Sequence, residues 1–412
     1  MKNTLKSILK IVASAMALLT LFALPACDDN PDEYVITGGE PTVDYIRLPD
    51  AISSDSLLTH AFMGTTIALI GENMTSVQEV WFNNVQATLN SSLIKSDVLI
   101  LSVPSTIPTN VTNKIYLINK DMDTVTYHFG VDVPSPILNT LTCEYANAGD
   151  IITINGNYFL SVAGSDVPEV YFTPNIKAEV VSYTLTQLNV KVPAAATEGP
   201  ITMKSRYGST RSTFRFRDSR GMILDWDNTN ASGGWRSGVI ANTNPTGITG
   251  NYVRFTGAMK GGAGETWNED AFAFNLWGTS NGRPEGDLFS IPVENAVLKF
   301  EVNVTQAWSA GALQMIFTSW STSGTNGYVG DATYPRGLWI PWEGSGSFTT
   351  NGWITVSIPL KNFKYNASGA EVSKLTAGNC GGLTFFVFNG GVKGTDCTPN
   401  ICIDNIRVVP AE

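Results

Sequence analysis

Histidine is almost absent from this chain, since His60 and His128 are the only two among 412 residues. The chain also lacks a Cys-x-x-Cys pair and a P-loop. Histidines and paired cysteines are the usual zinc ligands, and the P-loop belongs to nucleotide-binding proteins. We therefore expect no metal, no cofactor and no catalytic residues.

Basic residues are in the minority, and the only long apolar run lies at the N-terminus. Lysine and arginine number 26 against 36 aspartate and glutamate, which gives a net charge of −10. Such a chain is repelled by nucleic acids and by anionic membrane surfaces, so neither is an expected partner. Patterns of helical period are missing, whereas short β-branched and aromatic runs broken by Gly, Pro and Asn are abundant. This composition predicts an all-β fold.

The first 26 residues have the pattern of a signal peptide. Three lysines precede or begin an apolar stretch from Ile11 to Leu24, and a Leu-Pro-Ala-Cys sequence ends at Cys27. The stretch is short for a membrane span and typical of an export signal. The tetrapeptide resembles the lipobox of bacterial lipoproteins, which implies that Cys27 is acylated and begins the mature chain. An ordinary secretory signal is the alternative.

Residues 27–41 form an acidic segment with several Gly and Pro residues, which we interpret as a flexible tether. Its acidic run resembles the signal that Bacteroidetes use to send lipoproteins to the outer cell surface. The resemblance implies an outer-membrane lipoprotein exposed at the cell surface. A plain acidic linker is the alternative.

Two stretches after the tether repeat one another. Gly64–Met74 and Gly149–Phe159 share alternating apolar residues and a central glycine, Gly71 or Gly156, and a Val-Pro pair follows each. The offset of 85 to 90 residues suits one small β-sandwich per repeat. The alternation predicts one buried face per strand, and the central glycine predicts a tight turn or bulge.

The repeat resembles the IPT/TIG family of immunoglobulin-like domains. The resemblance implies two TIG-type β-sandwiches, at residues 42–133 and 134–217. Domains of this type usually act as spacers in exported proteins.

Beyond Asp218 the composition changes. Nine of the ten Trp and 28 of the 38 Gly lie there. So many Trp exceed the needs of one core, and exposed aromatics usually indicate recognition. Alternating apolar residues mark several strands, and a change of phase in 401–409 predicts a bulge at Asp404-Asn405. Many short strands with Gly-rich loops predict a larger jelly-roll β-sandwich at 218–412.

The whole order resembles the surface glycan-binding proteins of Bacteroidetes polysaccharide-utilisation systems, notably the type with a C-terminal xyloglucan-binding domain. The resemblance implies a non-catalytic lipoprotein that captures a polysaccharide in its C-terminal domain and works beside an outer-membrane glycan importer. Flat Trp rings favour a β-glucan such as xyloglucan, and the identity of the polysaccharide stays open.

Aromatic side chains are the expected ligand contacts. A sugar ring presents a face of C–H bonds that packs on an indole ring, and several rings are needed for useful affinity. Aromatics at strand ends and in loops reach a ligand most readily. The expected ligand-binding residues are Trp277, Trp308, Trp339, Trp342, Tyr334 and Trp267. Trp226 and Trp353 are expected in the core.

Two other functions remain open, a protein-binding adhesin and a jelly-roll glycoside hydrolase or lyase. The second would need a pair of carboxylates near the aromatics. The candidates are Glu265, Glu269, Asp270, Glu285, Asp287 and Glu343.

Two structural features are also possible in the C-terminal domain. A calcium ion would find oxygen ligands at Asp225, Asp227, Asp404 and Asn405, although solvated loop carboxylates explain these residues better. A disulfide among Cys380, Cys397 and Cys402 would staple a loop, with the pairing left open.

Overall fold

The computed structural model describes residues 35–411 except 54, 163, 232–238, 263–272, 280–281, 323–332 and 389. Strands and short 3₁₀ turns make up their regular structure, and none of the described residues belongs to an α-helix. The all-β prediction is therefore confirmed. The described residues also contain no helix long and apolar enough to cross a membrane. The signal peptide and Cys27 lie outside them.

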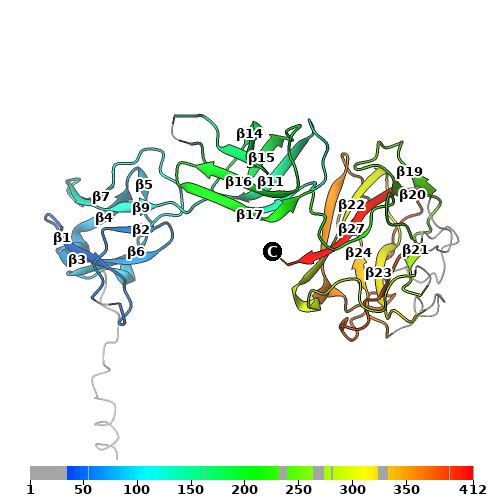
Figure 1. Cartoon of the computed structure of the whole chain (residues 1–412). Coiled ribbons are helices and arrows are strands. Elements are labelled where there is room, and N and C mark those ends of the chain that lie inside the picture. The colour runs from blue at the N-terminus through cyan, green and yellow to red at the C-terminus, as the bar shows by residue number, and fades with distance from the viewer. Residues whose placement is uncertain are drawn as a thin grey trace, which may run out of the picture. The chain divides into compact units, whose positions relative to one another are not determined.

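The chain divides into two compact units, the first ending at Val133 and the second beginning at Pro134 (Figure 1). The first unit is a β-sandwich. One sheet contains β1 (Thr42–Arg47), β3 (Thr66–Glu72) and β6 (Val98–Ser102) in that order. The other contains β5 (Val85–Gln86), β4 (Val77–Phe82), β7 (Lys114–Asn119) and β8 (Thr124–His128). A parallel pair joins β2 (His60–Phe62) to β9 (Gly130–Asp132).

The second unit begins with another sandwich, which we call the second Ig-like sandwich. Its first sheet has the order β10 (Ile137–Leu141), β11 (Ile151–Asn157), β15 (Gln187–Lys191) and β14 (Glu179–Tyr183). Its second sheet has the order β13 (Ile176–Lys177), β12 (Glu169–Phe172), β16 (Gly199–Ser205) and β17 (Gly208–Phe216).

The two sandwiches use the repeated glycine in the same way. Gly71 in β3 lies where a Cβ atom would come within 1.9 Å of the Thr42 carbonyl oxygen. Gly156 in β11 has the same relation to the Ile137 carbonyl oxygen, also at 1.9 Å. In both copies the register of the neighbouring strand shifts at this point. The predicted bulge is therefore confirmed, and its cause is the close approach of two backbones.

The C-terminal sandwich pairs two larger sheets, which we call the back sheet and the front sheet. The back sheet has the order β19 (Val239–Ala241), β20 (Tyr252–Thr256), β27 (Asn400–Pro410), β22 (Ala296–Gln306) and β25 (Ile354–Pro359), and β18 (Met222–Leu224) also pairs with β27. The front sheet has the order β21 (Ala273–Leu276), β26 (Gly382–Phe388), β23 (Ala312–Thr318) and β24 (Gly337–Trp339).

Alternate side chains of both sheets form one core. Phe300 of β22 packs edge-on against Phe385 of β26, with ring centroids 5.4 Å apart. Trp226 joins this core and is 3% exposed, as expected. The β22–β27 register shifts beside Asp404, so the predicted bulge in the last strand is confirmed. Asn405 there has a φ of +50°.

The second Ig-like sandwich and the C-terminal sandwich share a packed interface. Ile248 comes from the C-terminal sandwich but lies in the core of the second Ig-like sandwich, and Trp353 packs against that same core. The Thr355 N–H in β25 donates to the Thr142 carbonyl at 2.9 Å. The Glu144 N–H donates to the Thr355 Oγ1 at 2.7 Å.

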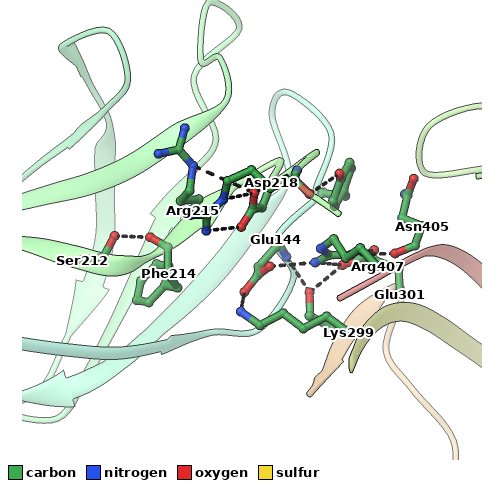
Figure 2. A network of polar contacts seen from close by, with 12 residues as sticks. Glu144, Ser212, Phe214, Arg215, Asp218, Lys299, Glu301, Asn405 and Arg407 are labelled. Carbon is green, nitrogen blue, oxygen red and sulfur yellow. Dashed lines mark hydrogen bonds and ion pairs between the residues drawn. The ribbon is translucent and has the colours of Figure 1, made fainter. Parts of the chain in front are cut away.

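Four buried charges cross this interface (Figure 2). The Glu144 carboxylate lies 2.7 Å from the Lys299 ammonium and 2.7 Å from the Arg407 guanidinium. Arg407 also pairs with Glu301 at 2.8 Å. Each of the four side chains is at most 5% exposed. Two acids and two bases compensate one another, which is the condition under which buried charges are tolerated.

Candidate functional site

The front sheet turns one face to the C-terminal core and the other away from it. Phe274, Met315 and Phe385 point into the core. Their neighbours along each strand lie on the opposite face, which we call the outer face, because side chains alternate along a strand. The outer face carries Ala273, Asn275, Gln314, Ile316, Thr318, Thr384, Phe386 and Phe388. The second Ig-like sandwich contacts the back sheet, so the outer face lies on the other side of the domain.

A row of polar side chains crosses the outer face. The Thr384 hydroxyl donates to the Asn275 side-chain oxygen at 2.7 Å. The Gln314 side-chain oxygen accepts from Arg336 Nη1 at 2.9 Å, and its amide donates to the Ala367 carbonyl at 3.1 Å. Gln314 and Arg336 are both fully buried. Asn275 and Thr384 are at most 3% exposed, so these hydrogen bonds form a buried polar network that holds the neighbouring strands in fixed positions.

Three half-buried aromatics gather at one end of the outer face, and we call them the strand-end aromatics: Trp277, Trp320 and Tyr334. Trp277 follows the end of β21, and Trp320 follows the end of β23. The Tyr334 hydroxyl donates to the Phe317 carbonyl at 2.9 Å, which brings its ring over the same strand end. Partly exposed rings beside hydrogen-bonding groups are the combination that sugar recognition needs.

Glycines make room for Trp320. A Cβ atom at Gly278 would lie 2.2 Å from Trp320 Cδ1, and one at Gly381 would lie 2.5 Å from the Trp320 backbone. Arg283 Nη2 donates to the Gly381 carbonyl at 3.1 Å. Burial lowers the pKa of Arg283. The end of the outer face therefore combines aromatic rings with a partly desolvated guanidinium.

Trp308 and Trp342 require a correction, because the structure buries both. Trp308 is 0% exposed and donates its indole N–H to the Ala310 carbonyl, and Trp342 is 3% exposed and donates to the Gly311 carbonyl. Trp308 follows a strand end, as expected, but its backbone pairs with Phe348, which turns the ring into the core. Neither ring has a face open to a sugar.

Trp339 also packs inward. Its ring meets Phe300, Trp308 and Phe348 edge-on, with centroids 5.6 to 5.8 Å apart. Trp267, the sixth expected residue, lies outside the described residues. Of the six, the structure therefore brings only Trp277 and Tyr334 to the outer face among the residues it describes. Trp320 joins them although it was not expected.

The structure also places the carboxylates considered for catalysis and the cysteines considered for a disulfide. The Asp287 carboxylate accepts the N–H groups of Gly378 and Cys380, at 2.8 and 3.0 Å. Glu285 and Glu343 are exposed. Glu265, Glu269 and Asp270 lie outside the described residues. Cys143, Cys380, Cys397 and Cys402 are free thiols, so the disulfide that the sequence allowed is not formed.

The four calcium candidates are satisfied by neighbouring groups. Asp225 accepts loop N–H groups, including that of Thr229 at 2.7 Å, and Asp227 accepts the Asn251 N–H at 3.0 Å. Asp404 accepts the Asn405 N–H at 2.8 Å and the Thr249 hydroxyl at 3.0 Å. Within the described ranges, no three His, Cys, Asp or Glu side chains are grouped so that they could hold a metal ion.

Comparison with known proteins identifies the family. A family profile described as "Surface glycan-binding protein B xyloglucan binding domain" matches residues 216–410. The crystal structure of the surface glycan-binding protein PbSGBP-B from Prevotella bryantii is 30% identical in sequence, with a TM-score of 0.76. That match covers 92% of this chain and all of the other. The chain belongs to the surface glycan-binding protein B family.

A second relative carries the name of the IPT/TIG domain. An IPT/TIG domain-containing protein of Bacteroides ovatus is 27% identical over 168 residues. The aligned region covers 38% of this chain and 33% of that relative, so the chain matches only a third of its length. The expected surface glycan-binding protein B resemblance and the IPT/TIG resemblance are both confirmed. The profile and the solved relative are described as glycan-binding proteins, which indicates binding rather than catalysis.

Proposed function

We propose that this member of the surface glycan-binding protein B family captures an extended polysaccharide at the strand-end aromatics of the front sheet. The observation that carries the proposal is the grouping of Trp277, Trp320 and Tyr334 beside the polar row of Asn275 and Gln314. Aromatic rings accept the C–H faces of sugars, and the buried amides of Asn275 and Gln314 hold the sheet beneath these rings in place. The family profile favours xyloglucan or a similar β-glucan.

The remaining sequence features complete the proposal. The lipobox at Cys27 anchors the mature chain in the outer membrane, and the acidic tether directs it to the cell surface. The Ig-like sandwiches set the reach of the glycan-binding domain. The bound polysaccharide is passed to an outer-membrane importer without being cleaved.

Affinity electrophoresis of the mature chain tests this function. Gels containing xyloglucan, mixed-linkage β-glucan or mannan are compared with gels lacking glycan, and we expect retardation in one β-glucan. Trp277→Ala, Trp320→Ala and Tyr334→Ala each remove about 1 kcal/mol of stacking, so each weakens retention several-fold. Trp81→Ala, which changes a half-buried Trp of the first unit, is the matched control and leaves retention unchanged.

Two outcomes contradict the proposal. Retention that survives all three substitutions would place the site elsewhere on the domain. A chain that no glycan retards would favour the adhesin function instead.

A further inference from the structure

A cleft of about 460 Å³ lies where the second Ig-like sandwich meets the C-terminal sandwich. One wall comes from β10 and the residues that follow it, including Thr140 and Thr142. The other wall comes from β25, including Ile354, Ser357 and Pro359. Because β25 belongs to the back sheet, the cleft is separate from the outer face of the front sheet.

The lining combines apolar and hydrogen-bonding groups. Val297, Ile354, Pro359 and Pro410 supply apolar surface. Asn139, Thr140, Asn155 and Ser357 supply amides and hydroxyls. A sugar ring has the same two aspects, a face of C–H bonds and a rim of hydroxyls, so this lining fits a carbohydrate.

The charges of the cleft favour a neutral ligand. Glu144 and Lys299 also line it, but they lie 2.7 Å apart and are only 3% and 5% exposed. Their charges compensate one another, and Arg407 binds the second oxygen of Glu144 at 2.7 Å. A charged ligand would find no uncompensated partner among these groups.

The walls are fixed before any ligand arrives. The hydrogen bond from Thr355 to Thr142 and the buried pair of Glu144 with Arg407 hold β10 and β25 together. A preformed cleft binds without the cost of ordering its walls. The same contacts occupy part of the free edge of β25, which disfavours an added peptide strand.

Hydrogen-bonding groups continue from the cleft across the neighbouring sheet. The Asn155 amide donates to the Thr140 hydroxyl at 3.2 Å, and the Gln187 amide donates to the Asn155 side-chain oxygen at 3.3 Å. Asn155 lies in β11 and Gln187 in β15, so these groups extend over three adjacent strands. An extended chain of neutral sugars leaving the cleft would follow this row.

We propose that the cleft is a second carbohydrate site, which holds a neutral segment of the same polysaccharide that the outer face binds. This inference rests on the proposed function. Two sites on one compact unit raise the retention of a long polymer through effective concentration, even where the second site is weak.

Amide-detected NMR of the mature chain tests the cleft, with cellohexaose and a xylogluco-oligosaccharide as probes. We expect saturable shifts of the Thr140, Thr142 and Ser357 amide signals. Ser357→Trp fills the cleft and abolishes these shifts. Ser209→Trp changes another exposed serine, which lies in β17 outside the cleft, and retains these shifts. Thr140→Trp fills the cleft from the opposite wall and should cause the same loss of shifts. One of the two variants therefore still tests the cleft if the other folds poorly.

The Trp320 indole signal separates the two proposals, because it reports on the outer face. If it shifts while the cleft signals stay fixed, the cleft proposal is overturned and the proposed function stands. If neither the Trp320 signal nor the cleft signals shift with any glycan, both the cleft proposal and the proposed function fail. A hexagalacturonate or an extended peptide that shifts the cleft signals more than the neutral probes would overturn the assignment of a neutral carbohydrate.

Discussion

Asp404 is a carboxylate held where ionisation is unfavourable. It is fully buried in the bulge of β27, and its hydrogen-bond donors are the neutral groups of Asn405 and Thr249. Burial, more than the nearby Glu301 and Asp227 charges, raises the pKa of Asp404 to about 8. The folded protein therefore keeps a proton on this side chain at pH values where the unfolded chain releases it.

The stability of the protein should consequently fall as the pH rises through this window. Below about pH 4 the carboxyl is protonated in both states, whereas between about pH 4 and pH 8 only the folded state holds the proton. Asp404→Asn removes this titration. We expect the variant to gain stability relative to the native chain between pH 4.5 and pH 7.5, measured by urea unfolding. A difference in unfolding free energy between Asp404→Asn and the native chain that is the same at pH 4.5 and pH 7.5 would contradict this account.

A substitution at Glu144 tests how much the buried charges of the interface contribute to the stability of the second unit. Glu144→Gln leaves Lys299 and Arg407 with Glu301 as the remaining acid of the group, and breaking such a pair costs about 3–5 kcal/mol. Denaturant unfolding of the second unit measures the loss. Glu169→Gln is the control, because its partner Lys177 is 58% exposed and a surface pair contributes below about 1 kcal/mol. Equal losses for both substitutions would contradict the special role of the interface.

At the scale of elements, the close approach of neighbouring strands explains the repeated glycine. Gly156→Ala would place a Cβ atom 1.9 Å from the Ile137 carbonyl oxygen and 2.6 Å from the Phe159 ring. Separating β10 from β11 costs about 1–3 kcal/mol, and thermal unfolding should show a lower melting temperature. Gly344→Ala, at a position with open space around it, should leave that temperature unchanged. A harmless Gly156→Ala would show that β10 can move away freely.

The sequence predicts the strands better than it predicts the site. Alternation places Phe300 in the core, and the repeat locates the glycine bulges, because both depend on residues close together along the chain. Trp308 and Trp320 each follow a strand end, and the local pattern does not distinguish them. Trp308 turns inward because its backbone pairs with Phe348, and Trp320 is placed by Gly278 and Gly381. Such distant partners become visible only in the folded chain.

At the scale of the whole molecule, the second Ig-like sandwich is part of the glycan-binding unit. Its core includes Ile248 of the C-terminal sandwich, and Glu144 neutralises charges on the back sheet. A flexible spacer would show neither feature. The second Ig-like sandwich is therefore packed onto the domain whose reach it would set.

Two truncations test this coupling. A chain of residues 134–412 retains the whole second unit and should melt at the temperature of that unit in the mature protein. A chain of residues 216–412 loses Glu144 and uncovers Ile248 and Trp353, so we expect a melting temperature several degrees lower. Differential scanning calorimetry measures both. Identical melting temperatures would show that the C-terminal sandwich is self-sufficient.

The pairing of Glu144 with Arg407 also constrains how such a gene can be inherited. The two residues stand 263 positions apart, and the family profile begins at residue 216, between them. A recombination event that imported a new sugar-binding module at that boundary would separate each charge from its partner. An exchange that transfers the preceding sandwich as well keeps the pair intact, so we expect the two modules to be inherited together.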